Sequence, residues 1–322
     1  MDEDGLFRFG AYLEPLSQLN FNDADLSDVR AWWGRPQKGL LGRLVRRMRL
    51  KQWHYVCVNH PECFLAVAVA QLGYVGNVFV YLVKNGRKFE TERIIPLGLG
   101  IRVGASSRQK STYSGIEIGF GQEHWTCRLD VKLEGRPLKG EMKLQPTDVL
   151  ALLHPLHQNR AAYTHKEVGN ECAGWVEWDR QRIDLEGSLG GIDYTCSYAD
   201  RHTEWRWIFL TGRTRDGRRF GFNGAERLYG DAENYVWLDG VRSPVGALRF
   251  TIPPQGPWGI DGPGANLLFA PSGCRAKNVN YGLVRSRFLQ PYGVATGSVS
   301  LAGETIELGN VFGVCEEHDA LW

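Results

Sequence analysis

Short apolar runs with an alternating pattern, separated by turn-forming residues, recur along this chain. In VFVYLVKNGRKFE the pair Asn85-Gly86 stands between two such runs, which is a common signal of a β-hairpin with a two-residue turn. WTCRLDVKLEGRPLKGEMKL repeats the pattern around Gly135, and further turns are expected at Gly217 and Gly303. Short strands joined by frequent turns predict an all-β protein made of antiparallel barrels or sandwiches.

Helical periodicity is confined to two short segments. DVLALLHPLH begins at Asp148 and could form two turns before Pro155 ends it. Residues 38–50 place leucines, a valine and a methionine on one helical face and four arginines around the other. Such a segment can act as a lid, touch an anionic membrane as a peripheral contact, or cover an apolar core with a solvated basic face.

Length and composition allow one large or two ordinary globular domains. The chain has 322 residues, of which 43% are hydrophobic and 23% are charged. A polar stretch with little periodicity, residues 154–174, separates two strand-rich halves of about one barrel each. We therefore expect an N-terminal β-barrel domain at 1–165 and a C-terminal one at 166–322.

Charge, targeting signals and cysteines indicate the class of partner, the cellular location and the state of the thiols. The net charge of +2 is too small to indicate nucleic acid as a partner. The N-terminal residues resemble no signal peptide, and no apolar run reaches the length of a membrane span, so a cytoplasmic protein is expected. The seven cysteines are scattered without a CxxC pair, which favours reduced thiols over a disulfide framework or a zinc site.

Motifs along nearly the whole chain resemble the family called "domain of unknown function 2804". They are WWGRP, RMRLKQWHYVCV, LAVAVAQLGYVGNVFVY, YTHKEVGNECAG, GGIDYTCSYADRHTEWRWIFLTG, GFNGAERLYGDAENYVWLDG and GVCEEHDALW. The central motif, an Asp followed by Trp-x-Trp and a hairpin, is in turn similar to the carotenoid 1,2-hydratase and AttH-like proteins. This wider resemblance implies two lipocalin-like, calycin-type antiparallel β-barrels packed together with few short helices.

The wider group includes hydratases of isoprenoid alkenes and cyclases that work without a cofactor, so the resemblance implies similar chemistry as one expectation. One departure limits what it carries over. After its Asp the AttH-like pattern usually has His and Gln, whereas this chain reads DYTCS from Asp193. Only Asp193, Trp205 and Trp207 match by position.

Those matching residues suggest an acid beside aromatic walls. In a strand, alternation places Trp205, Trp207 and Phe209 on one face, which is expected to look into a barrel. Adding water to an alkene begins with protonation of carbon, which needs a carboxylic acid kept neutral by burial. Asp193 is the first candidate for that acid; the competing interpretation is an Asp that caps a turn after two glycines.

Five further residues are candidates around these walls. Tyr198 and His202 are expected to assist catalysis, with His202 as base or proton shuttle. Alternation, however, puts His202 on the strand face opposite the tryptophans, where a surface histidine is the simpler interpretation. Asn223 and Glu226 follow the hairpin and could return to the tryptophan face, or form a solvated turn. Trp237 on the next strand is another expected wall.

Metal and cofactor signatures are weak. Glu316, Glu317, His318 and Asp319 could suggest a metal, but neighbouring residues on a strand point apart and no second histidine stands at ligand spacing. The chain has no dinucleotide-binding fingerprint, P-loop, HExxH or GxSxG motif. The sequence therefore predicts no metal and no cofactor.

Three functions remain open at this point. The first is a cofactor-independent lyase or isomerase, a hydratase or cyclase, acting on an isoprenoid or polyketide-like hydrophobic small molecule. The second is a carrier that holds a lipid or other hydrophobic ligand in the same cavity without chemistry. The third is a carbohydrate-active protein with tryptophan platforms and two carboxylates, which the resemblance does not favour. The expected partner is a hydrophobic small molecule, and the sequence leaves the oligomeric state open.

Overall fold

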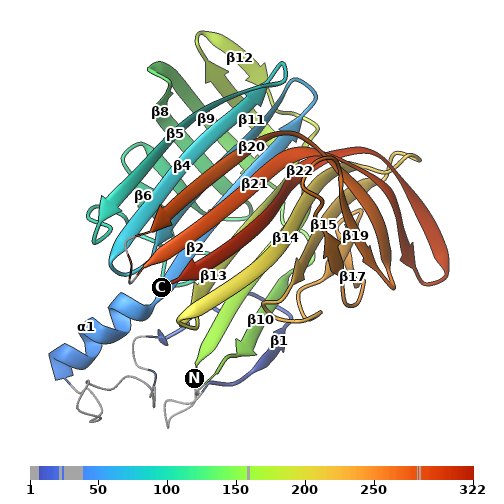
Figure 1. Ribbon diagram of the computed structural model, residues 1–322. Coiled ribbons are helices and arrows are strands. Elements are labelled where there is room, and N and C mark those ends of the chain that lie inside the picture. The colour runs from blue at the N-terminus through green and yellow to red at the C-terminus, as the bar shows by residue number, and fades with distance from the viewer. Residues whose placement is uncertain (1–6, 22–23, 25–38, 158–159, 281, 283) are drawn as a thin grey trace.

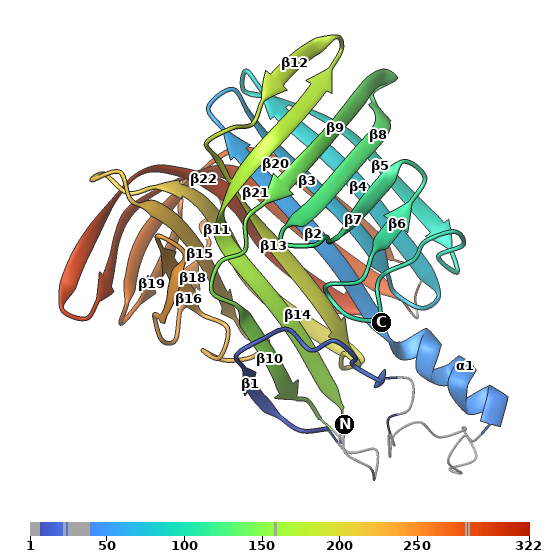
Figure 2. The same ribbon diagram turned by 180° about the vertical axis from the view of Figure 1, so that it is seen from behind.

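Two strongly curled antiparallel sheets and one short helix make up the part of the chain that the structure describes (Figures 1 and 2). The structure is a computed structural model and describes residues 7–21, 24, 39–157, 160–280, 282 and 284–322. The motif WWGRP lies outside these residues. The prediction of an all-β protein with two barrel-like halves is confirmed.

The first sheet holds thirteen strands in the order β5-β4-β3-β2-β13-β11-β9-β8-β7-β6, with β1, β10 and β12 attached beside β11. Its strands are β1 (Gly10–Tyr12), β2 (Lys51–His60), β3 (Cys63–Gln71), β4 (Val75–Lys84), β5 (Arg87–Pro96), β6 (Ser111–Tyr113), β7 (Ile116–Phe120), β8 (Trp125–Leu133), β9 (Arg136–Leu144), β10 (Leu150–Pro155), β11 (Ala161–Trp178), β12 (Gln181–Asp184) and β13 (Ser188–Ser197).

The second sheet holds nine strands in the order β17-β16-β15-β14-β22-β21-β20-β19-β18. Its strands are β14 (His202–Arg213), β15 (Arg219–Glu226), β16 (Tyr235–Leu238), β17 (Val241–Pro244), β18 (Arg249–Thr251), β19 (Trp258–Gly262), β20 (Ala265–Asn280), β21 (Arg285–Leu301) and β22 (Glu304–Leu321). Both figures show the long strands β20–β22 lying along β2–β5 of the first sheet.

The expected hairpins form where the turn residues predicted them. Asn85 and Gly86 both have positive φ, 50° and 72°, which suits a two-residue turn whose twist matches the paired strands β4 and β5. Glu134-Gly135 joins β8 to β9 in the same way, and Ala302-Gly303 joins β21 to β22. The turn chemistry thus fixes the register of these hairpins.

One expected helix is a strand and the other is a helix. The prediction of two helical turns from Asp148 is wrong, because Leu150–Pro155 forms β10 between β1 and β11. Four successive apolar residues there are buried on both faces, a pattern that periodicity alone does not distinguish from a buried helix. The amphipathic segment forms α1, Gly39–Arg49.

The sheet boundary falls later than the expected domain boundary. The chain leaves the first sheet after β13, at Ser197, and enters the second at His202 in β14. The expected boundary at residues 165 and 166 lies inside β11, which pairs with β10 and β13 of the same sheet. The division into the domains 1–165 and 166–322 stays a prediction.

Four apolar cores lie in the described residues, and three of them fill the curls of the two sheets and the contact between them. One fills the curl of the first sheet and contains Val56 and Ile192, and one fills the curl of the second and contains Ile208 and Leu210. The third lies between the sheets, because it combines residues of both. Its members include Tyr55, Cys57, Phe64, Tyr81, Trp207, Phe209, Trp237, Tyr292 and Val314.

The third core corrects the expected direction of the tryptophan face. Ile208 and Leu210 on β14 point into the curl of the second sheet, whereas Trp207 and Phe209 point toward the first sheet. Both faces of β14 are apolar, so alternation separated the two sets correctly but did not say which set lies inside a barrel. The aromatic face lines the junction of the sheets instead.

Cysteine state and membrane spans complete the description. All seven cysteines lie in the described residues as free thiols, as the spacing predicted, and only Cys274 is exposed. Among the described residues, no helix has the length and apolar character that crossing a bilayer requires.

Candidate functional site

A cavity of about 380 Å³ lies between the two sheets and is largely apolar. The first sheet contributes strands β2–β5, β11 and β13 to its wall, and the second contributes β14, β15 and β20–β22. Aromatic side chains from both sheets face it, namely Trp53, Tyr55, Tyr74, Phe79, Trp205, Trp207, Tyr229, Phe288 and Trp322. The cavity therefore has the composition of a site for a hydrophobic small molecule.

A buried carboxyl group, Glu316 on β22, stands in this aromatic wall and is 7% exposed. Trp205 Nε1 donates a hydrogen bond to its Oε1 over 2.6 Å, and Gln290 Nε2 donates to its Oε2 over 2.9 Å. Burial raises the pKa of Glu316 from its ordinary 4.5 to about 7, although both hydrogen bonds oppose the shift. The group therefore holds a proton at pH values where an exposed glutamate has lost it.

An ion-paired cluster of Lys166, Asp193 and Glu233 forms another part of the wall. Lys166 Nζ on β11 lies 2.9 Å from Asp193 Oδ1 and 3.4 Å from Glu233 Oε2, and each of the three residues is at most 5% exposed. Burial opposes the charge on Lys166, but the two carboxyl groups outweigh it and raise the pKa of the ammonium. One cation is thus shared between two acids.

The two acids of this cluster differ in their surroundings. Asp193 on β13 accepts two hydrogen bonds, from Lys166 and, over 3.3 Å, from Trp53 Nε1. Burial raises the pKa of Glu233, helped by the charge of Asp193 and opposed by Lys166. Burial therefore favours the protonated form of Glu233.

His318 lies two residues after Glu316 on the same face of β22. Its ring centroid is 4.2 Å from that of Trp205, and its Nδ1 is 4.0 Å from Glu316 Oε1. Its Nε2 shares a hydrogen bond of 2.8 Å with the Ser286 hydroxyl. Burial lowers the pKa of His318 to about 3, so the imidazole is neutral and can accept a proton only transiently.

Three of the residues predicted from the sequence line this cavity: Asp193, Trp205 and Trp207. Asp193 is buried within β13 and does not cap a turn, and its pairing with Lys166 was not foreseen. The tryptophans are pocket walls as expected, although the pocket lies between the sheets.

Three other predicted residues are buried outside the cavity lining. Tyr198 donates its hydroxyl hydrogen to the Phe21 carbonyl over 2.6 Å, and Trp237 Nε1 donates to the Asp148 carbonyl over 2.7 Å. Asn223 accepts a hydrogen bond of 2.8 Å from Trp207 Nε1 and donates one of 2.7 Å to the Glu233 carbonyl. Asn223 therefore positions two pocket residues without touching the cavity.

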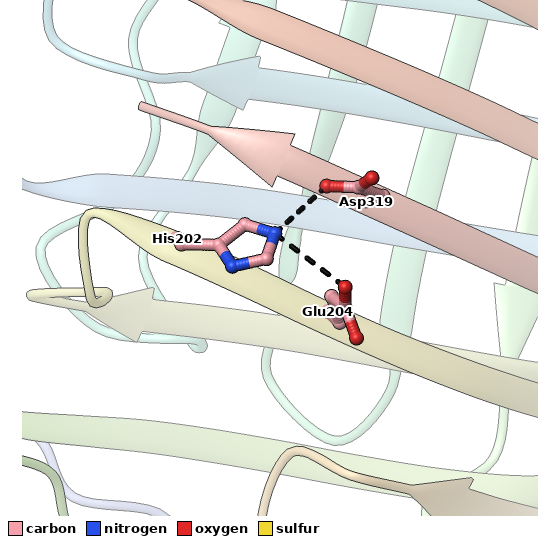
Figure 3. Close-up of side chains that lie close together, drawn as sticks. All are labelled: His202, Glu204 and Asp319. Atoms are coloured by element: carbon pink, nitrogen blue, oxygen red, sulfur yellow. Dashed lines mark hydrogen bonds and ion pairs between the residues drawn. The ribbon is translucent and has the colours of Figure 1, made fainter.

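The remaining two predicted residues point away from it. Glu226 pairs with Arg206, 3.0 Å between Oε2 and NH1. His202 is half-exposed, and its Nε2 lies 2.9 Å from Asp319 Oδ1 and 3.5 Å from Glu204 Oε1 (Figure 3). Alternation had placed His202 opposite the tryptophans, and the structure agrees, although His202 also borders a second cavity of about 110 Å³.

The cluster in Figure 3 is the one group in the described residues with a metal-like arrangement of ligand atoms, all within 4.8 Å of one another. Cations already stand beside its acids: Arg227 NH1 lies 3.0 Å from Glu204 Oε2, and Arg285 NH2 lies 3.3 Å from Asp319 Oδ1. The carboxylates are thus paired by the protein itself, which weakens their attraction for a metal ion.

Sequence reasoning missed Lys166 and Gln290, and named Glu316 and His318 only as metal candidates. The strand register explains the position of Glu316 and His318, because Glu316 stands opposite Trp207 and His318 opposite Trp205 in the β14–β22 pair. Side chains opposite one another in antiparallel strands share a face. The alternation of Glu316 and His318 with their neighbours was the available signal, but it needed the strand pairing to be known.

Comparison with known proteins agrees with this fold. The family model "Domain of unknown function (DUF2804)" matches residues 2–322, so the chain belongs to that family. Sequence comparison gives no match to a curated protein.

Comparison of structures finds similar solved proteins. Kievitone hydratase from Nectria haematococca is 7% identical, with a TM-score of 0.54 and coverage of 83% of this chain and 88% of that one. A Nitrosomonas europaea protein with the AttH designation is 12% identical, with a TM-score of 0.49 and coverage of 84% and 92%. The protein CghA is 12% identical, with a TM-score of 0.48 and coverage of 84% and 87%. At 7% identity the likeness to kievitone hydratase is one of fold alone.

Proposed function

We propose that this member of the DUF2804 family is a cofactor-independent enzyme, a hydratase- or cyclase-type lyase or isomerase, that protonates a hydrophobic small molecule of isoprenoid or polyketide-like character. The observation that carries the proposal is Glu316, a buried carboxyl group with a pKa of about 7 in an aromatic cavity. A strongly shifted acid inside a cleft is a typical feature of catalytic sites.

Glu316 is the proposed general acid. Its proton goes to a carbon of the substrate double bond, and the positive charge that forms on the neighbouring carbon lies among indole rings. Each ring, Trp53, Trp205 or Trp207, contributes roughly 0.5–2 kcal/mol of cation–π attraction. Proton transfer from a positioned acid supplies a further factor of about 10²–10⁴ in rate.

Asp193 is the proposed base rather than the acid, because the Lys166 ammonium lies 2.9 Å from its Oδ1. In a hydration it takes a proton from the water whose oxygen bonds to the cationic carbon. In a cyclisation it takes a proton from the substrate itself. Exchange with solvent then returns Asp193 to its carboxylate form and Glu316 to its acid form, so that no other reactant is consumed.

A carrier without chemistry is the second candidate, favoured by the apolar lining. Burying Lys166, Asp193 and Glu233 destabilises the folded protein. A carrier gains nothing from these charges, since apolar residues of similar size hold a hydrophobic ligand equally well. The charged cluster therefore favours the enzyme.

The test is proton transfer to carbon in heavy water. Purified protein is incubated in D₂O with whatever hydrophobic molecule copurifies from its host and with a panel of isoprenoid alkenes, and mass spectrometry follows deuterium entering a C–H position. Glu316→Gln should lower this rate by at least about 10²-fold. Glu317→Gln is the matched control, since Glu317 pairs with Arg206 outside the cavity, and should stay near wild type.

The outcomes separate the two candidates. Ligand binding by the wild-type protein without deuterium incorporation would support the carrier. Equal rates for Glu316→Gln and wild type would remove Glu316 from the mechanism.

A further inference from the structure

Helix α1 exposes an apolar face to solvent. Leu40, Leu41 and Leu44 are 77%, 51% and 56% exposed, while the next two members of the same face, Val45 and Met48, are half-buried. A helix of a globular protein usually turns its apolar stripe toward the core, because that is where burial stabilises it. Here the first two turns of the stripe project outward.

Arginines occupy the opposite side of this helix. Arg43, Arg46, Arg47 and Arg49 lie around the remainder of the helical circumference, and α1 contains no acidic residue. Arg43 and Arg47 are exposed. The helix therefore combines exposed leucines with a concentrated positive charge, although the whole chain is nearly neutral.

The C-terminal end of α1 is fixed against the wall of the cavity. Lys51, just after the helix, donates hydrogen bonds to the carbonyls of Met48 and Leu72 over 3.2 and 2.7 Å. Its Nζ lies 4.4 Å from the Tyr74 ring and 5.3 Å from the Trp322 ring. Leu72, Tyr74 and Trp322 all line the cavity, so the helix leaves the molecule directly beside it.

The figures show the same relation between the helix and the sheets. In both views α1 extends away from the point where β2 begins and the chain ends after β22 (Figures 1 and 2). Gly42 is buried and Val45 packs against an apolar cluster, whereas Leu40, Leu41 and Leu44 remain exposed and can meet a flat surface.

We infer that α1 docks the protein on an anionic lipid surface, with Leu40, Leu41 and Leu44 inserted among the acyl chains and Arg43 and Arg47 at the headgroups. Eleven residues are too few to span a bilayer, but they suffice for a helix lying in the interface. Arginine side chains reach from such a helix to lipid phosphates, and each contributes to attraction toward a negatively charged leaflet.

This surface gives a hydrophobic molecule a route into the cavity. Such a molecule partitions into lipid, and docking through α1 places Tyr74 and Trp322 close to the bilayer. The inference concerns delivery and does not depend on the chemistry proposed for Glu316.

Vesicle co-sedimentation tests the inference. Wild-type protein should pellet with phosphatidylcholine vesicles that contain about 30% phosphatidylglycerol, and bind at least about tenfold less to pure phosphatidylcholine. Salt at about 0.5 M should weaken the binding, because it screens the attraction between charges that lie more than a few ångströms apart. Equal binding to both vesicles would overturn the requirement for anionic lipid.

Variants identify the helix as the contact. Leu40→Ser with Leu44→Ser should reduce vesicle binding by about tenfold or more, because the inserted apolar area is lost. Arg43→Gln with Arg47→Gln should reduce it by about fivefold for each arginine. Leu268→Ser is the matched control, since Leu268 is 51% exposed on β20 and should leave binding unchanged.

Two results would overturn the inference. In the first, wild-type protein stays in solution with both kinds of vesicle, as expected if a protein partner covers α1. In the second, the serine variants pellet like wild type. Circular dichroism of each variant checks that the sheets remain folded. Because vesicle binding is the only readout, failure here leaves the deuterium experiment and its outcome unaffected.

Discussion

Two opposing effects act on the pKa of Glu316. Its two hydrogen bonds, from Trp205 and Gln290, favour the carboxylate, whereas its burial among aromatic rings favours the neutral acid. Burial prevails, because two neutral donors replace only part of the hydration that a carboxylate loses. Tyr81 donates a hydrogen bond of 3.3 Å to Gln290 Oε1 and so orients the amide that faces Glu316.

The raised pKa of Glu316 makes the stability of the protein depend on pH. Below pH 4.5 the group is protonated in both the folded and the unfolded chain, and its stabilising effect is complete. As the pH rises from 4.5 to about 7 only the unfolded chain ionises, so this contribution to the free energy of unfolding is lost. The size of the loss is on the order of 3 kcal/mol.

Glu316→Gln should remove this dependence, because glutamine does not titrate. The difference in unfolding free energy, wild type minus variant, should therefore decrease between pH 4.5 and 7 and level off above. Urea denaturation of both proteins across that range measures it. A constant difference would mean that Glu316 has an ordinary pKa. Glu317→Gln serves again as control.

At the scale of elements, the two sheets approach one another so closely that glycine is needed at the contact. A Cβ added to Gly221 on β15 would lie 2.5 Å from the Val168 carbonyl carbon and 2.6 Å from the Gly169 nitrogen, both on β11. Gly169 itself has φ of 76° at the bulge where the register of β11 shifts. The bulge and Gly221 together let the two backbones touch.

Gly221→Ala should therefore destabilise the protein by about 1–3 kcal/mol, as other overpacked positions do, because neither backbone can move aside freely. Gly259→Ala on β19 is the matched control, since its added Cβ would meet only atoms at 3.4 and 3.6 Å. Thermal and urea unfolding compare the two variants. If the Gly221→Ala protein is as stable as the Gly259→Ala protein, the sheets separate easily.

At the scale of the whole molecule, the cavity exists because the outer faces of both sheets are apolar where they meet. The third core packs strand faces that a lone barrel would expose to water, such as those carrying Tyr55 and Phe64. Neither sheet is therefore complete without the other, although each has a core of its own. The site belongs to the pair of sheets.

Two fragments test where the first unit ends. A fragment of residues 1–200 contains every strand of the first sheet, whereas a fragment of residues 1–165 ends within β11 and lacks β13, which stands between β2 and β11. We expect the longer fragment to unfold cooperatively in urea and the shorter one not to. The longer fragment should also bind a hydrophobic dye, because its side of the third core is exposed. Equal cooperativity would support the boundary at 165 instead.

The sequence by itself determined the local features of this protein. Turn pairs such as Asn85-Gly86 determined the hairpins, since few residues accept positive φ, and alternation around Trp205 and Trp207 assigned each side chain to a strand face. Family motifs added the two-barrel architecture and indicated Asp193 as a candidate site residue. Burial on both faces hid β10, because the period of its pattern was lost.

Only the tertiary structure decided what those faces meet. Lys166, Glu233 and Glu316 are far apart in the sequence, and their convergence depends on strand register and on the contact between sheets. Alternation distinguishes two faces of a strand without saying which one a second sheet will cover. The burial that raises the pKa of Glu316 comes from that covering, so its candidate role arises from packing rather than from any local motif.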